Sequence, residues 1–99
     1  MIRHVVAFRL SASDAGTRAE QAAEAARQLN ALLRVVPTLR AMSAGANMLA
    51  PDANWDLVLV ADFDDEAGLD AYQVHPAHKD VTAYIGSIRA ERVAVDFTI

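Results

Sequence analysis

Cysteine is missing from the sequence, so disulfide bonds, thiolate catalysis and cysteine-ligated zinc or iron–sulfur sites are excluded. Long apolar runs are missing too: the longest stretch without a polar residue, from Leu57 to Ala61, is far too short to cross a bilayer. Arg3, His4 and Arg9 interrupt the apolar start of the chain, so a signal peptide is not expected. From these absences we expect a cytoplasmic protein with no membrane partner.

Basic residues are outnumbered by acidic ones, nine against thirteen, which gives a net charge of −4. No basic run occurs, and because nucleic-acid phosphates are bound by clustered lysine and arginine, a nucleic-acid partner is not expected. The four glycines form no phosphate-binding loop. The serines lie in no nucleophile motif. The sequence therefore gives no indication of a nucleotide-binding protein or a serine hydrolase.

The patterns that are present fit one domain of 99 residues, without a linker, a low-complexity tract or a repeat. A chain of this length buries only about two-thirds of its unfolded surface, so oligomerisation would add materially to its stability. Residues 2–10 alternate and predict a strand, whose more apolar face carries Ile2, His4, Val6, Phe8 and Leu10. Two interpretations of His4 stay open: a half-buried histidine satisfied by a neighbour, or a residue that lines a cavity.

A long helix is predicted from about Arg18 to Val35. Residues 11–17 offer several helix caps, Thr17 with Glu20 fits the capping-box pattern, and Pro37 ends the segment. An apolar stripe recurs at steps of three and four residues and would lie on a sheet: Ala22, Ala26, Leu29, Leu33 and Val36.

Two further strands are predicted after this helix. The first covers residues 39–48 and leads into a loop at 47–54 that is mobile by composition. Residues 55–63 form the strongest strand pattern in the chain, with one apolar face made of Leu57, Leu59, Ala61 and Phe63. Val58 and Val60 make the centre of its other face apolar as well, so this strand needs cover on both sides.

The segment Tyr72-Gln-Val-His75-Pro76-Ala-His78 places two of the three histidines and one of the two tyrosines within seven residues. Proline suits the first turn of a helix and pushes the residue before it into extended geometry. One short helix should therefore end near Val74 and another should begin at Pro76. Tyr72 and His78 then converge across the bend, which predicts an acid/base pair in a pocket beside the first strand.

The remaining patterns complete an antiparallel sheet. The acidic residues 64–66 favour the start of the first short helix, the second should end around Ser87, and residues 89–99 alternate as a fourth strand. Helices in this order can cover only one face of the sheet, so the other face would stay in water. We expect that face to form a two-fold symmetric homodimer through an apolar patch: Val5, Ala7, Val58, Val60 and Ala94.

Four motifs together resemble the stress-responsive dimeric α/β-barrel (Dabb) family: His4-Val-Val-Ala-Phe8, Asp56-x-x-Leu59-x-x-x-Phe63, Ala71-Tyr72-x-x-His75-Pro76-x-His78 and Val95-Asp96-Phe97. The resemblance spans essentially the whole chain, and the Tyr-x-x-His-Pro-x-His segment is its most specific part. It implies a single Dabb domain over residues 1–99, of class α+β. The implied protomer is a ferredoxin-like, four-stranded antiparallel sheet with helices on one face, and two copies would form a dimeric α/β barrel.

The family includes a plant polyketide cyclase, olivetolic acid cyclase, which acts by aldol condensation. The resemblance implies that His78 is the general base, that Tyr72 holds or polarises a carbonyl, and that no cofactor is needed. Leu57 departs from the family, many of whose members have histidine there, and this makes the expected cavity more apolar. We expect a ligand to contact His4, Val6, Phe8, Leu57, Leu59, His75, Val81 and Tyr84.

Three other interpretations concern single residues. Asp96 is the candidate carboxylate for orienting His78, but its parity on the strand is opposite to that of Phe97, so either it points at the dimer face or the strand bends. His75 directly precedes a proline and is expected to serve the turn between the helices. His75 and His78 with Asp80 would make only a marginal ligand set, so no metal is expected.

Three classes of function stay open. The first is a cofactor-independent lyase or cyclase that acts by aldol-type chemistry on a small hydrophobic molecule containing a carbonyl group. The second is a non-catalytic ligand-binding or stress-responsive protein with the same cavity. The third is a cofactor-free monooxygenase, by analogy with other dimeric α/β barrels.

Overall fold

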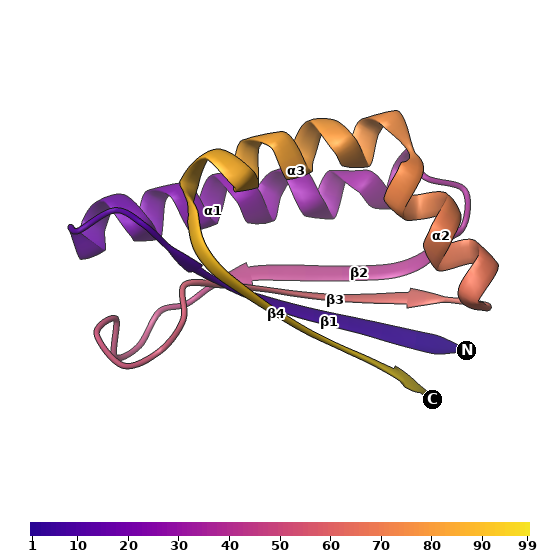
Figure 1. Cartoon of the computed structure of the whole chain (residues 1–99), viewed down its shortest axis with the longest axis horizontal. Helices are drawn as coiled ribbons and strands as arrows, with labels where there is room; N and C mark the ends of the chain where they lie inside the picture. The colour runs from indigo at the N-terminus through magenta and orange to yellow at the C-terminus, as the bar shows by residue number, and fades with distance from the viewer.

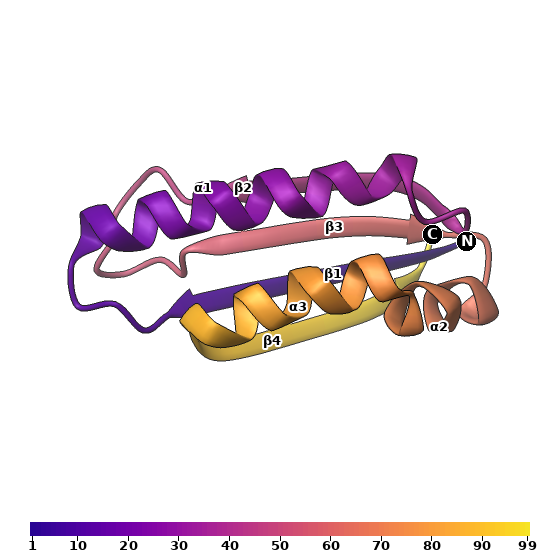
Figure 2. The same cartoon turned by 90° about the horizontal axis from the view of Figure 1, so that it is seen from above.

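The computed structural model describes residues 1–99 and shows one antiparallel sheet whose helices all lie on one side (Figure 1). The elements follow in the order β1 (Ile2–Leu10), α1 (Ala15–Ala31), the short 3₁₀ helix η1 (Leu32–Arg34), β2 (Leu39–Ala46), β3 (Leu57–Phe63), α2 (Glu66–Val74), α3 (Pro76–Ile88) and β4 (Arg89–Thr98). The strand order is β2-β3-β1-β4, with α1 above β2 and β3 and α3 above β1 and β4 (Figure 2). This confirms the α+β, ferredoxin-like class. No helix has both the length and the apolar character needed to cross a membrane.

The first helix begins earlier than predicted because Asp14, not Thr17, caps it. The Asp14 carboxylate accepts hydrogen bonds from the backbone N–H of Thr17 at 2.8 Å and from the Thr17 hydroxyl at 3.0 Å. These bonds lower the pKa of Asp14 below its ordinary value. Aspartate is at least as good an N-cap as threonine. The predicted capping box from Thr17 to Glu20 is therefore wrong, since Thr17 lies inside the helix.

The core lies between the sheet and the helices. Alternate residues of β1 and β3 point toward the helices and are buried there, from Val6 to Leu10 on β1 and from Leu57 to Phe63 on β3. Burying a large apolar side chain contributes roughly 1.5–3 kcal/mol, so this layer carries most of the stability of the protomer. The largest side chains with almost no exposed surface are Tyr72, Phe63, Leu29, Val6 and Val36.

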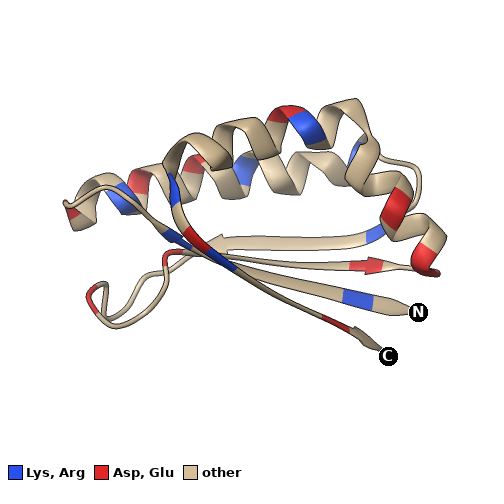
Figure 3. Cartoon of the chain, viewed as in Figure 1, with Lys and Arg blue, Asp and Glu red and all other residues tan.

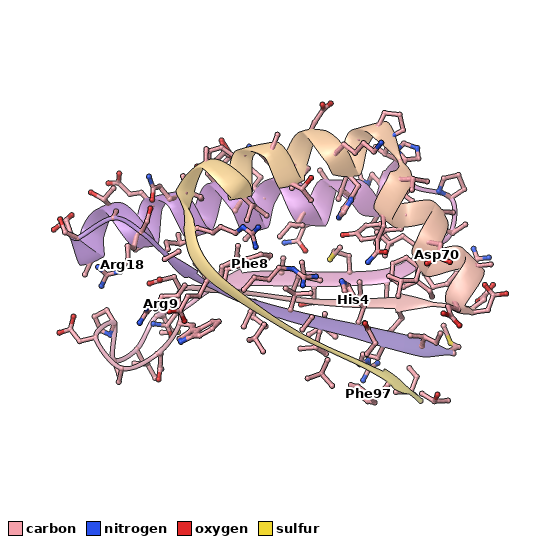
Figure 4. All side chains as sticks on the ribbon, in the orientation of Figure 1. His4, Phe8, Arg9, Arg18, Asp70 and Phe97 are labelled. Atoms are coloured by element: carbon pink, nitrogen blue, oxygen red, sulfur yellow. The ribbon has the colours of Figure 1, made fainter.

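The opposite face of the sheet is covered by no helix and is apolar at its centre. The strand register sets Val5 beside Val60 and Val95. Much of this surface is open to solvent, because Val95 is 59% exposed and Phe97 is 45% exposed. Figure 4 shows Phe97 pointing away from the helices. We call this surface the outer patch: Val5, Ala7, Val58, Val60, Val93, Val95 and Phe97.

Alternate residues of β4 face the opposite sides of the sheet from those predicted. Ala94 was expected in the outer patch, but it pairs with Val6 and packs against the core on the helix side. Asp96 pairs with His4 and lies on the helix side as well, not at the dimer face. The pairing of β4 with β1 is irregular beside Leu10, so long-range register, not the pattern within β4, decides which side each residue takes.

Two ion pairs border the outer patch. Arg3 donates through two guanidinium nitrogens to Asp62, at 2.8 and 3.0 Å. Arg9 Nη2 donates to Glu91 Oε1 at 2.7 Å across the other end of the strands. The Arg3 guanidinium lowers the pKa of the Asp62 carboxyl below its ordinary value. The outer face is therefore an apolar strip with a satisfied charge pair at each end.

A buried carboxylate ties the loop before β3 to the rest of the protomer. Asp56 donates its backbone N–H to the Phe8 carbonyl at 2.9 Å. Its carboxylate accepts from the Leu10 backbone N–H at 2.8 Å and from Arg18 Nε at 3.2 Å. The loop that precedes Leu57 is thus fixed at this end to both β1 and α1.

Candidate functional site

The bend between α2 and α3 is built by His75 and Pro76. His75 has extended backbone angles, φ −64° and ψ 135°, which stop α2 and cap α3, and Pro76 occupies the first turn of α3. The His75 Nδ1 accepts a hydrogen bond from the Ala77 backbone N–H at 3.1 Å. His75 therefore serves the turn, as predicted, and one of its ring nitrogens is committed to the cap.

This bend brings Tyr72 and His78 into contact, as predicted. Their ring centroids are 4.2 Å apart, and the ring planes are inclined by 47°. On its other side Tyr72 packs against Phe63, with a centroid distance of 5.1 Å. Phe63 belongs to β3, so the sheet holds the tyrosine ring in place and the ring in turn supports the imidazole.

The surroundings of His78 keep its imidazole neutral near pH 7. Burial lowers the pKa of His78 below its ordinary value, and the nearby His4, Arg92 and His75 lower it further, against the hydrogen bond to the Gln73 carbonyl. That bond joins His78 Nδ1 to the carbonyl oxygen at 3.2 Å, so Nδ1 carries the proton. The Nε2 lone pair is then free to accept a proton.

Tyr72 has the complementary property. Its burial raises the pKa of the phenol to about 12, so the hydroxyl keeps its proton at neutral pH. The Oη atom is buried and has no hydrogen-bond partner within the protein. A buried polar group without a partner costs about 1–3 kcal/mol. The pair thus combines a neutral base with an unsatisfied hydrogen-bond donor.

His4 lies on the helix side of β1, where Figure 4 shows it between the sheet and the helices. It is buried, with 4% of its surface exposed, and its Nδ1 is hydrogen-bonded to Asp96 Oδ1. Asp96 therefore orients His4 and does not fill the candidate role of orienting His78. Of the two interpretations left open for His4, the satisfied histidine is the one that this contact supports.

The other predicted ligand contacts lie in the core rather than around an open cavity. Val6, Phe8, Leu57, Leu59 and Val81 are buried, and Tyr84 is half-buried at the core edge. None of the hollows in the protomer is lined by Tyr72, His78 or His4, so the predicted void beside this pair is absent from the protomer. Ring-on-ring packing fills the space where that void was expected.

A hollow of about 150 Å³ lies further along α3. Sequence reasoning missed its two basic residues, Arg89 and Arg92. Their only signal was a pair of arginines at the start of a strand, and the side each one takes depends on the irregular register with β1. The lining comprises Phe8, Thr82, Ile85, Gly86, Arg89 and Arg92.

No group of three or more histidine, aspartate and glutamate side chains is placed to hold a metal ion. The functional groups that the structure does assemble are the neutral imidazole of His78, the phenol of Tyr72 and the His4–Asp96 pair. Such a set can move a proton and stabilise a developing oxyanion.

Known structures share this fold. A dimeric ferredoxin-like protein from Thermobifida fusca is 35% identical, with 99% of this chain and 90% of that chain covered and a TM-score of 0.82. A dimeric protein of ferredoxin-like fold from Bacteroides fragilis is 22% identical, with coverage of 99% and 95% and a TM-score of 0.84. An antibiotic biosynthesis monooxygenase is 14% identical, with coverage of 100% and 98% and a TM-score of 0.76, a likeness of fold alone.

No curated protein matches the chain. The model of the Stress responsive A/B Barrel Domain family, Dabb, matches residues 2–99. This match spans nearly the whole chain and includes both the bend with Tyr72 and His78 and the paired strands β1 and β4. The chain therefore belongs to the Dabb family.

Proposed function

We propose that this protein is a cofactor-independent enzyme of the lyase or cyclase type that acts on a small hydrophobic molecule containing a carbonyl group. The observation that carries this proposal is the contact between the rings of Tyr72 and His78, whose centroids are 4.2 Å apart. The pKa values of the two groups are shifted in opposite directions. Burial lowers the pKa of the base and raises the pKa of the donor, so both are in their useful form at neutral pH.

The reaction begins with proton transfer to His78. Nε2 takes a proton from a carbon next to a carbonyl group, and the Tyr72 hydroxyl donates a hydrogen bond to the carbonyl oxygen as negative charge develops on it. The enolate carbon then attacks a second carbonyl of the same molecule and forms a carbon–carbon bond. The proton held by His78 passes to the new alkoxide, so the step needs neither an oxidant nor a cofactor.

The surroundings of the pair select an apolar substrate. Leu57 and Leu59 are buried beneath the helices. The polar groups on this side of the sheet are His4 of β1 and Asp96 of β4, which are hydrogen-bonded to each other. The substrate reaches His78 from the side of the imidazole that is still exposed, since His78 is half-buried. The other contacts that we propose for it are Val6, Phe8, His75, Val81 and Tyr84. These contacts require the packing around the ring pair to open when the substrate binds, because the protomer has no void there.

We also propose that two copies associate through the outer patch and form the α/β barrel. An apolar sheet face with Val95 59% exposed and Val93 49% exposed is unusual for a monomer in water. The structural relatives from Thermobifida fusca and Bacteroides fragilis are both described as dimeric. Pairing two such faces covers the apolar strip and leaves the charge pairs at its rim.

Two other functions compete with the cyclase. The fold shared with an antibiotic biosynthesis monooxygenase favours a cofactor-free monooxygenase, in which the carbanion formed at His78 reacts with oxygen. The unsatisfied Tyr72 hydroxyl also favours a ligand-binding or stress-responsive protein, in which this hydroxyl binds a ligand without turnover.

The test is turnover of a panel of poly-β-keto thioesters and acids by the wild type, His78→Ala and Tyr72→Phe. We expect His78→Ala to lose about 10²- to 10⁴-fold in rate while its circular dichroism and ligand affinity stay unchanged. Asp80→Ala, on the exposed side of the same helix, is the matched control and should keep its rate. Oxygen uptake during turnover would replace the cyclase by the monooxygenase, and binding without turnover by the wild type would overturn both enzymes.

A further inference from the structure

The hollow between α3 and β4 combines apolar core residues with two arginines. Its floor is Phe8 of β1, its helix wall carries Thr82, Ile85 and Gly86, and its strand side carries Arg89 and Arg92. Figure 2 shows α3 lying along β4, and Figure 1 shows the chain turning directly from one to the other at this end of the sheet. The hollow is therefore apolar at its base and cationic at its rim.

The two arginines at the rim have no acidic partner. Five of the eight arginines of the chain form ion pairs, those at positions 3, 9, 18, 27 and 40, although acidic residues exceed basic ones by thirteen to nine. Glu91 lies between Arg89 and Arg92 in the sequence, but it is on the other face of β4 and bonds Arg9. Figure 3 shows the basic positions at the start of β4, where the strand leaves α3.

Gly86 keeps the hollow open. It has ordinary helical backbone angles, and a Cβ atom at this position would meet nothing within 4 Å. Neither backbone geometry nor close packing requires glycine here. A glycine inside a helix costs roughly 0.5–1 kcal/mol relative to alanine, so its presence leaves space at the expense of helix stability.

The hollow continues the face of α3 that carries His78. Thr82 lies four residues after His78, and Gly86 four residues after Thr82, so the three residues follow one side of the helix over about 12 Å. Arg92 is close enough to contribute to the lowered pKa of His78. A single elongated molecule can therefore reach both ends.

We propose that Arg89 and Arg92 bind a carboxylate group of the substrate, which makes the substrate an elongated apolar keto acid. This inference rests on the proposed function for the identity of the reacting end. The carboxylate receives the guanidinium forks, the apolar chain lies over Phe8 and Ile85, and the carbonyl group reaches Tyr72 and His78. Guanidinium groups match a carboxylate in charge and in bidentate geometry, which favours a fixed orientation of the molecule.

Equilibrium binding of octanoate and 1-octanol, followed by amide chemical shifts, tests the subsite alone because neither probe has a ketone on which His78 and Tyr72 could act. Octanoate should bind more tightly than 1-octanol, and Arg92→Gln should weaken octanoate about tenfold and leave 1-octanol unchanged. Arg34→Gln is the matched control, since Arg34 is also unpaired but lies on η1. Gly86→Leu should weaken both probes by filling the hollow without disturbing the fold.

The outcomes separate this inference from the proposed function. The affinity of His78→Ala for octanoate should equal that of the wild type. Retained octanoate binding supports the subsite even if the reaction at His78 differs from the one proposed. Equal affinity for octanoate and 1-octanol, or an Arg92→Gln variant that binds octanoate like the wild type, would overturn the inference while leaving His78 and Tyr72 as the proposed pair. Inorganic phosphate that displaces octanoate at lower concentration than acetate does would overturn the assignment to a carboxylate.

Discussion

The two faces of the single sheet are built from the same kinds of residue but end in different surroundings. On the helix side, Val6 is 1% exposed, and the polar residue that stands out is His4, paired with Asp96. On the outer side, Val95 is 59% exposed, and the polar residues are paired with each other at the ends. An unusual residue thus means something different on each face: a polar group marks the candidate site on the buried face, and a row of apolar groups marks the candidate interface on the exposed one.

The largest effect should come from putting a charge into the outer patch. Val60→Asp places a carboxylate in the proposed dimer interface, where an unpaired buried charge costs about 3–5 kcal/mol, and two-fold symmetry applies that cost twice. We expect a monomer in analytical ultracentrifugation at concentrations where the wild type is a dimer. Ala23→Asp, with the same charge on the exposed side of α1, should stay dimeric. A dimeric Val60→Asp variant would remove the distinction between the faces.

On the helix side, the pH dependence of turnover tests the neutral imidazole. Because burial lowers the pKa of His78 below 6.5, the deprotonated base should already dominate at pH 7. We expect kcat/KM to be flat above neutrality and to fall about tenfold per pH unit below a midpoint lower than 6.5. A midpoint above 6.5 would mean that the imidazole is stabilised in its charged form, against the burial described here.

A smaller effect is expected from the unsatisfied hydroxyl. Tyr72→Phe removes a buried oxygen without a partner, so the free energy of unfolding should rise by about 1 kcal/mol even as turnover falls. Tyr84→Phe is the control, because Tyr84 is only half-buried and its change should stay within about 0.5 kcal/mol. Urea denaturation measures both. A Tyr72→Phe variant less stable than the wild type would indicate that the hydroxyl has a partner.

The smallest effect concerns the charge pair at the rim of the outer patch. Arg3 lowers the pKa of Asp62 below its ordinary value, so the stability gained from this pair is present above about pH 4 and is lost as the pH falls through the lowered pKa. Asp62→Asn should therefore lose less stability than the wild type between pH 5 and pH 2 in urea titrations. The more exposed pair of Asp64 with Arg40 should show a weaker dependence. Identical pH curves for wild type and Asp62→Asn would contradict the role of Arg3.

Local signals predicted most of the fold. The alternation in β1 and β3 and the position of Pro76 gave the strands, the bend and the approach of Tyr72 to His78, because each depends on neighbouring residues only. The predicted start of α1 was wrong because Asp14 and Thr17 are both good N-caps. Only the structure shows that Asp14 is the one that caps the helix.

What depends on distant residues was not predictable. The side taken by Ala94 and Asp96 follows from register with β1, and the two alternating sets of β4 are too similar to choose between. The pairing of Asp96 with His4 joins residues that are 92 positions apart in the sequence. The predicted void failed for a related reason, because whether three rings leave a gap or fill it depends on their tilt, which no sequence pattern specifies.

The placement of the candidate site and the outer patch on opposite sides of one sheet has a consequence for subunit mixing. In the proposed dimer, Tyr72, His78, His4 and Arg92 of one site would all come from one copy, because the outer patch lies on the other side of the sheet. Hybrids formed by mixing His78→Ala with Tyr72→Phe should regain no turnover, since every subunit still lacks one partner. Each barrel would then work as two independent reaction centres set back to back.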